Sequence, residues 1–183
     1  GSYDYLRGVL SLAKTEGKWS HFVSGQQQES DPYISGADLG YKVRQGNYRM
    51  SYQADRYNTV LGVGYLDKDF GAQGFFGTSP AARDIPSSEN SIQRHAYVTH
   101  DHTVVNDQSV DLAISYRQHT DRFFYPGFAP FEHETNALQA RIRYRLGESL
   151  VAGYEFNQED IESSSIVGTE HERDNRRVVL YGS

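Results

Sequence analysis

Histidine pairs are the first candidates for chemistry in this sequence. His100 and His102 are separated by one residue, so they would share one face of an extended strand, and His95 is close to them in the chain. Two imidazoles placed in this way could begin a metal site. A polar turn is the better interpretation, because the pair leads into a short connection. His119 and His133 border a longer connection and lack a third ligand, so we expect no metal and no cofactor.

The remaining polar residues do not match the motifs of an enzyme active site. Ser163–Ser165 is a run of serines without the G-x-S-x-G context of a nucleophile elbow. Glu159, Asp160 and Glu162 do not follow EF-hand spacing, and a solvated loop explains them better. The glycines at 71, 74 and 77 precede no expected helix, so they do not form a phosphate cradle. We therefore expect no enzyme activity.

An aromatic stretch is the most suggestive exposed feature. Residues 123–131 contain five aromatic residues and two prolines. Aromatic rings provide a large contact area, and proline restricts the backbone, so this stretch could bind a ligand with an apolar or aromatic surface. The alternative is a loop packed on its neighbours, or part of an aromatic belt. Together with two aromatic residues of other expected loops, the predicted ligand-binding residues are Tyr33, Phe75, Phe123, Phe124, Tyr125, Phe128 and Phe131.

Four arginines form a second candidate set: Arg117, Arg141, Arg143 and Arg145. The last three alternate along one expected strand, so they would point to the same face. Three guanidinium groups are too costly to bury in a core without partners. They suit a water-filled or plugged lumen, where they would pair with acidic residues or attract an anionic chelate. We favour the structural pairing over direct ligand binding.

The overall composition narrows the class of protein. The 183 residues carry a net charge of −6, with 14 Tyr, 9 Phe, no Cys and a mean hydropathy of −0.68. The acidic balance argues against nucleic-acid binding, and the absence of Cys excludes disulfides and thiolate sites. No stretch approaches the roughly 18 apolar residues of a helical membrane span. A transmembrane barrel stays possible, because its strands face the lipid with only every second residue.

The elements that must position these side chains are strands. In Val110–Arg117 apolar residues alternate with small or polar ones, and Leu138–Leu146 repeats the pattern. The same period recurs along the chain and predicts an all-β protein with about nine strands of roughly ten residues. In the third strand, Tyr41 and Val43 occupy odd positions but Tyr48 to Tyr52 even ones. We therefore expect a β-bulge near residues 45–46.

The connections between the expected strands alternate in length. Tight ones are expected at 15–18, 55–58, 101–108 and 147–149, and long ones at 31–36, 67–90, 119–134 and 158–173. Alternate connections of an antiparallel up-and-down meander lie at opposite ends, so one end would be trimmed and the other elaborate. This asymmetry is typical of a transmembrane β-barrel. A one-sided antiparallel sheet packed on another domain would show the same alternation of faces.

Five motifs occur along the chain in the order of one family: Gly1-Ser2-Tyr3, Ser30-Asp31-Pro32-Tyr33, Gly64–Phe76, Tyr116–Phe123 and Gly153–Ser164. The third reads GYLDKDFGAQGFF. Together they resemble TonB-dependent outer-membrane receptors, in which a strand ending in Gly-Tyr runs into a K-D-F-G-A-x-x-F-Y loop. Phe76 replaces the last Tyr of that pattern, and Pro32 replaces the Gly of the family's D-G-Y.

The resemblance implies part of a barrel of about 22 strands, whose lumen a separate plug domain fills. Residues 1–183 would form one partial barrel domain of about nine strands, located in the bacterial outer membrane. The whole receptor would import a scarce nutrient such as a ferric siderophore or cobalamin. The long loops would form the capture face, and the tight turns would face the periplasm.

The partners implied are outer-membrane lipid, the TonB complex through a plug domain absent from this sequence, and a small-molecule or metal-chelate ligand. No nucleic acid is expected. Two alternatives stay open: a small outer-membrane barrel or pore without TonB coupling, and a soluble all-β ligand-binding domain.

Overall fold

The computed structural model describes residues 4–32, 39–72, 85–105, 107–147, 150–164 and 171–182. No helix long and apolar enough to cross a membrane occurs in these ranges. The strands found there are β1 (Leu6–Glu16), β2 (Trp19–Ser30), β3 (Tyr41–Gln53), β4 (Tyr57–Gly71), β5 (Ser88–Val105), β6 (Gln108–Phe124), β7 (Phe131–Leu146), β8 (Leu150–Ser163) and β9 (His171–Gly182). The all-β prediction is confirmed.

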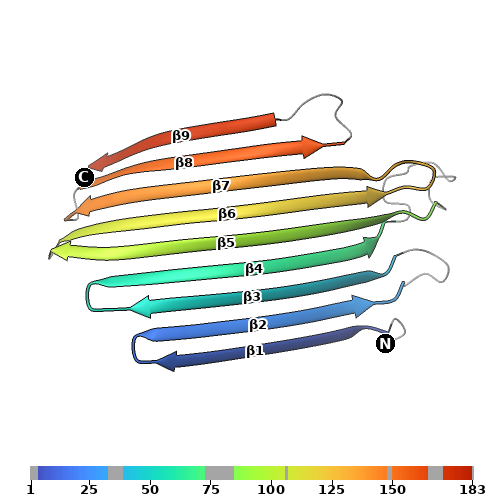
Figure 1. Ribbon diagram of the computed structural model, residues 1–183, viewed down its shortest axis with the longest axis horizontal. Helices are drawn as coiled ribbons and strands as arrows, with labels where there is room; N and C mark the ends of the chain where they lie inside the picture. Colours follow the sequence, from blue (N-terminus) through green and yellow to red (C-terminus); the bar gives the residue numbers. More distant parts are fainter. Residues whose placement is uncertain are drawn as a thin grey trace.

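The nine strands form one antiparallel sheet in which each strand pairs with its neighbours in sequence (Figure 1). The short connections lie at one end of the sheet and the long ones at the other, as the sequence predicts. The sheet is not closed: β1 and β9 are its two edges. Because the strands alternate in direction and their number is odd, β1 and β9 run the same way.

The strands are longer than the sequence pattern indicates. They contain 11 to 18 residues, with β5 the longest. The predicted long loop at 119–134 is therefore wrong in its bounds: the β6–β7 pairing continues up to Phe123 and Phe131. His119, Phe123, Phe124 and Phe131 lie in strands. Both faces are polar over residues 118–122 and 132–136, which separate the phenylalanines from the alternating apolar stripes, so alternation of hydropathy does not reveal these strand ends.

The predicted bulge near residues 45–46 is wrong as well. Strand β3 pairs without interruption from Tyr41 to Gln53 with β4, and its pairing with β2 is equally regular. Tyr41 and Val43 therefore point to one face, and Tyr48 and Met50 to the other. The apparent change of phase arises because the apolar side chains change face along this strand while the backbone stays regular.

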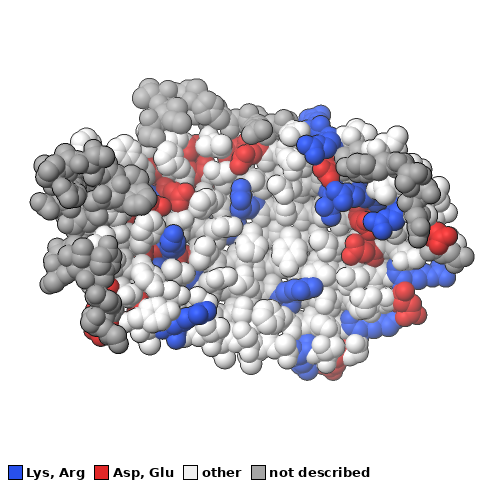
Figure 2. Space-filling model, turned by 180° about the vertical axis from the view of Figure 1, so that it is seen from behind, with Lys and Arg blue, Asp and Glu red and all other residues white. Residues whose placement is uncertain are grey.

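The register divides the side chains into two faces. The apolar face carries the even positions of every strand except β2 and β4, which contribute odd positions. Its large apolar residues are exposed, including Leu10, Val23, Leu61, Ile114, Ile142 and Val178. The polar face, seen in Figure 2, carries the other positions. Val60, Ala72 and Ala137 are the only hydrophobic residues buried in the described ranges, so the sheet encloses no core there.

The apolar residues form a band that crosses the strands obliquely. In β1 the band ends before the turn, where Lys14 and Glu16 follow, whereas in β7 it reaches the turn at Leu146. The row of directly opposite residues that begins at Leu10 in β1 reaches Asn136 in β7. Because Leu10 is apolar and Asn136 is polar, the band does not follow this row. A level band on tilted strands must cross the register in this way, and strands tilt in every closed barrel.

Three strand glycines accommodate large side chains on the polar face. A Cβ atom at Gly62 would lie 2.3 Å from the Tyr97 ring, and one at Gly64 would lie 2.2 Å from the His95 ring. At Gly153 a Cβ atom would lie 2.9 Å from the backbone oxygen of Ile142 and 3.0 Å from Cγ of Arg143. These glycines let bulky side chains lie flat across the neighbouring strand.

Candidate functional site

The four predicted arginines share the polar face. Arg117 belongs to β6, and the other three lie on odd positions of β7. Lys and Arg side chains gather on this face over the end of the sheet that carries the short turns (Figure 2). The prediction that they lie on one face is confirmed, and the sheet positions them because odd residues of β6 and β7 are directly opposite each other.

Two of the arginines have acidic partners on β8. Arg143 donates from Nη2 to Glu155 Oε1 at 2.7 Å, and Arg117 lies 3.9 Å from Glu159. The Arg143 pair is the more enclosed, and its Nε is buried without a hydrogen-bond partner in the described part of the chain. Arg143 is therefore fixed by the stem contact with Gly153 and by Glu155.

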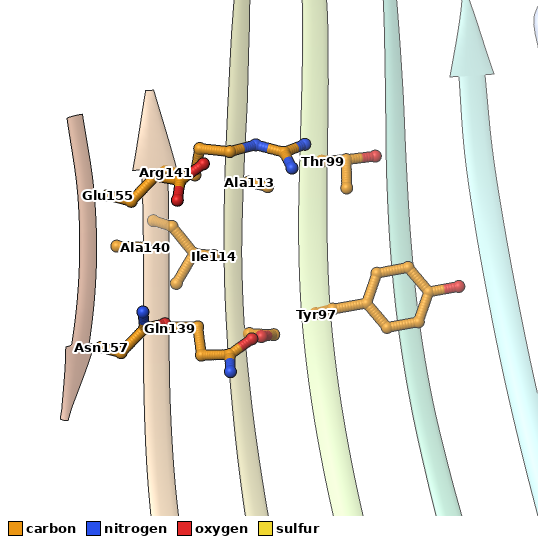
Figure 3. Close-up of a pocket in the computed structure, with 10 residues that line it drawn as sticks. Tyr97, Thr99, Ala113, Ile114, Gln139, Ala140, Arg141, Glu155 and Asn157 are labelled. Carbon is orange, nitrogen blue, oxygen red and sulfur yellow. The ribbon is translucent and has the colours of Figure 1, made fainter. Parts of the chain in front are cut away.

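Arg141 borders a cavity of about 370 Å³ on the polar face. Its side chain extends from β7 across β6, over Ala113, toward Thr99 (Figure 3). Gln139 and Asn157 add polar groups to the lining. Within the described ranges Arg141 forms no ion pair closer than 4 Å. Its guanidinium group is therefore able to donate hydrogen bonds to an anion or a carbonyl in the cavity.

The aromatic stretch is brought together only in part. Phe123 and Phe131 face each other across β6 and β7 on the polar face, with ring centroids 6.4 Å apart. Tyr125 contacts both Phe123 and Phe128, at 6.3 and 5.7 Å. Phe124 points to the apolar side, away from this chain of rings. Four of the five predicted aromatic residues of this stretch therefore form one continuous group.

This group, the aromatic ridge, consists of Phe123, Tyr125, Phe128 and Phe131. Phe128 is its most exposed member, with 65% of its surface accessible. A cavity of about 260 Å³ separates residues 124–128 from Pro86 and Ser88, before and at the start of β5. The ridge can therefore offer ring faces to a ligand at the elaborate end of the sheet. Tyr33 and Phe75, also predicted to bind ligand, lie outside the described residues.

The histidines do not assemble as one metal site. His100 and His102 share the apolar face, whereas His95 lies on the polar face. His119 and His133 are on adjacent strands of the polar face, and His119 Nε2 lies 2.9 Å from Ser91 Oγ and 3.2 Å from Asp121 Oδ1. In the ranges that the structure covers, no three metal-ligating side chains are close enough to hold an ion.

A ring cluster at the short-turn end of the apolar face was not predicted. Its members are Trp19, Tyr52, Tyr57, His100 and His102, from four successive strands. Neighbouring rings lie 4.6 to 6.0 Å apart. Each residue begins, ends or lies near the turn end of its strand, but only the strand register shows that they meet.

Charged residues on the apolar face occur mainly beyond the band, toward the long loops. Arg122 pairs there with Glu132 at 2.8 Å, and Arg44 lies 3.8 Å from Asp67. Glu134, also beyond the band, accepts hydrogen bonds from Asn136 and Gln118. The pKa of the Glu134 carboxyl is held below its ordinary value. The hydrogen bond from Asn136 lowers it most, the one from Gln118 comes next, and the nearby arginines contribute less.

Comparison with known proteins identifies a fold relative. No family model and no curated protein sequence matches the chain. A solved structure that resembles it is BauA, the ferric preacinetobactin receptor from Acinetobacter baumannii, with a TM-score of 0.64 and 11% sequence identity. The match covers 96% of this chain and 37% of BauA, so the chain spans little more than a third of that receptor. At this identity the likeness shows the fold alone.

Proposed function

We propose that this chain is part of a TonB-dependent receptor of the bacterial outer membrane, which imports a scarce nutrient such as a ferric siderophore or cobalamin. The observation that carries the proposal is the oblique band of exposed apolar side chains on one face of the sheet. Tilted strands in a bilayer require such a band. The fold relationship to BauA, a siderophore receptor, supports the same conclusion.

The polar face would line the lumen of the barrel. Its arginines, the cavity beside Arg141 and the cross-strand pair Arg143–Glu155 are too polar for a dry core but suit a wet or filled interior. The proposed partners are outer-membrane lipid on the apolar face, the TonB complex through a plug domain, and a small-molecule or metal-chelate ligand. Binding and transport require no bond making by these residues, so we propose no enzyme activity.

The end of the sheet with the long connections would be the capture face. The aromatic ridge lies at this end, and its exposed rings are suited to a ligand with apolar or aromatic surface. The short turns would face the periplasm, which is the usual orientation of bacterial barrels.

Strand direction favours a larger barrel over a small one closed by this sheet. Because β1 and β9 run the same way, their direct pairing would be parallel. Antiparallel closure requires an odd number of additional strands, as expected if this sheet is one section of a receptor barrel.

The test uses the full-length protein in its native host. We expect it in the outer-membrane fraction, and we expect a strain without the gene to lose uptake of at least one ligand from a panel of ferric siderophores and cyanocobalamin. Uptake should also stop when TonB is removed. Recovery from the aqueous fraction without detergent would contradict the membrane assignment, and uptake that continues without TonB would favour a passive pore.

A further inference from the structure

We propose that the ring cluster of the apolar face is a binding site for the phosphate group of a phospholipid. The inference rests on the proposed membrane barrel and adds a specific headgroup contact to it. Trp19, Tyr57, His100 and His102 would surround the headgroup, and the imidazole N–H groups would donate to its phosphate oxygens.

The position of the cluster fits the boundary between hydrocarbon and water. On the side toward the band, the next row of this face contains the apolar residues Met50, Leu61, Val98 and Ile114. The β2 residue of this row is polar: it is His21, whose Nδ1 lies 2.8 Å from the Tyr48 hydroxyl. On the other side the strands end in short turns, where Lys18 and Arg56 are exposed. Trp19 and Tyr57 are 44% and 37% exposed, and such rings occupy membrane interfaces because one end is apolar and the other polar.

Hydrogen-bonding capacity in the cluster remains available for an acceptor. Nδ1 of His100 is 2.8 Å from Thr59 Oγ1, which leaves Nε2 at the far side of the ring. His102 contacts the rings of Tyr57 and His100, and neither of its nitrogens has a hydrogen-bond partner in the described part of the chain. When the Thr59 hydroxyl donates to Nδ1, the Nε2–H of His100 is a donor.

The balance of charges around the cluster favours an anionic occupant. Among the described residues at this end of the β1–β2 and β3–β4 hairpins, Lys14, Lys18 and Arg56 stand against the carboxylates of Asp55 and Glu16. Of these two carboxylates, only that of Glu16 lies in a strand, and it is bound by Lys14 at 2.8 Å. The site therefore combines imidazole N–H donors and nearby cations with apolar residues on the side toward the band. A phosphate attached to acyl chains satisfies both requirements at once, which neither a free anion nor a hydrocarbon does.

The test measures phospholipid bound to the full-length protein in detergent. Dimyristoylphosphatidylglycerol is titrated into delipidated protein, and bound lipid is counted by native mass spectrometry. The variant is His100→Phe with His102→Phe, which keeps the rings but removes the donors. The control is His95→Phe, on the opposite face of the same strand. Dimyristoylglycerol, which lacks the phosphate, is the control lipid.

We expect the double variant to bind phosphatidylglycerol about tenfold more weakly, as loss of a hydrogen bond to a charged group implies, with no change for the control variant or for dimyristoylglycerol. If the double variant does not fold, His102→Phe alone is used, because His102 forms no hydrogen bond among the described residues.

Equal phosphatidylglycerol binding by wild type and variant, in protein that partitions into detergent, would overturn the headgroup site and leave the barrel proposal standing. Equal loss in the His95 control would also overturn it. A wild-type protein that stays in the aqueous phase and binds no lipid would overturn both proposals together.

Discussion

At the scale of single residues, the strand glycines differ in what lies beside them. Gly62 and Gly64 are covered by side chains of the adjacent strand, and Gly153 lies against the backbone of Ile142 and the Arg143 side chain, so a methyl group at any of the three would displace a neighbour. Gly8 and Gly46 have no atom within 4 Å of the position of a Cβ. Some glycines of this sheet should therefore tolerate substitution by alanine and others should not. Contacts with the adjacent strand determine which glycines belong to each group.

Substitution of Gly62 tests this difference. We expect Gly62→Ala to lower the free energy of unfolding by about 1–3 kcal/mol, because the Tyr97 ring must leave its place. Gly46→Ala is the matched control and should be neutral or stabilising by up to about 1 kcal/mol, since alanine restricts the unfolded chain. Urea unfolding of the full-length protein in detergent gives both values, and equal effects would contradict the packing of Tyr97.

Ile142 and Gln139 test the assignment of the two faces. Ile142 is 48% exposed on the apolar face, whereas Gln139 lines the cavity of the polar face. Arginine at a lipid-facing position near the bilayer midplane costs about 2–4 kcal/mol. We expect Ile142→Arg to reduce the folded fraction recovered in outer membranes far more than Gln139→Arg. Equal tolerance of the two would mean that the faces, or the membrane, are wrongly assigned.

At the scale of elements, the strand ends beyond the apolar band are stabilised by polar networks. Glu134 accepts two side-chain hydrogen bonds, and its pKa is lowered in the folded state. A lowered pKa contributes stability above the unfolded pKa, and that stability is lost as the pH falls through the folded value. We expect Glu134→Gln to flatten the loss of stability between about pH 5 and pH 3.

The measurement is the urea midpoint as a function of pH, with Glu16→Gln as the control. Glu16 is exposed in β1, and among the described residues its carboxylate has an ion pair with Lys14 alone. The same pH slope in wild type and Glu134→Gln would contradict the role of this carboxylate.

The aromatic ridge belongs to the same scale, because a loop and two strand ends build it. Phe128→Ala should weaken uptake of the cognate ligand by about tenfold or more, as removal of an aromatic anchor commonly does. Folding should be unaffected, since Phe128 is 65% exposed. Val105→Ala, at the opposite end of the sheet, is the control. The measurement is the rate of uptake of each ferric siderophore and of cyanocobalamin by wild type and variant. Unchanged rates for every ligand would mean that Phe128 does not contribute to ligand capture.

The order and number of strands were predictable from sequence because each apolar stripe alternates with period two. The ends of strands were not, since residues 118–122, which include His119, are polar on both faces and cut off Phe123 from the alternating stripe of β6. The common face of Arg141, Arg143 and Arg145 followed from their spacing. The ring cluster around Tyr57 could not be predicted, because its contacts depend on the register between strands and not on spacing within one.

At the scale of the whole molecule, the described strands form a sheet with two edges, β1 and β9, and one face with exposed apolar side chains. Its backbone groups at β1 and β9 must pair with further strands before the apolar face can enter a bilayer, where unpaired backbone is costly. BauA, the fold relative, is a longer chain, of which this chain spans 37%.

The intact mass of the native protein tests this expectation. We expect protein extracted with detergent from outer membranes to have a mass well above the 20.7 kDa of this chain. Mass spectrometry of the purified protein gives the answer. A native mass near 20.7 kDa would contradict the receptor and favour a small barrel.

The pairing of each strand with its sequence neighbours alone has a further consequence, for how such a protein changes over generations. Every hairpin is a self-contained unit that touches the units before and after it. Duplication of one hairpin adds two strands and loss of one removes two, and either change keeps the alternation of directions and leaves the other pairings intact. The width of the sheet is therefore able to change in steps of two strands, and in the proposed barrel a lineage could widen or narrow the circumference without altering the strands that it keeps.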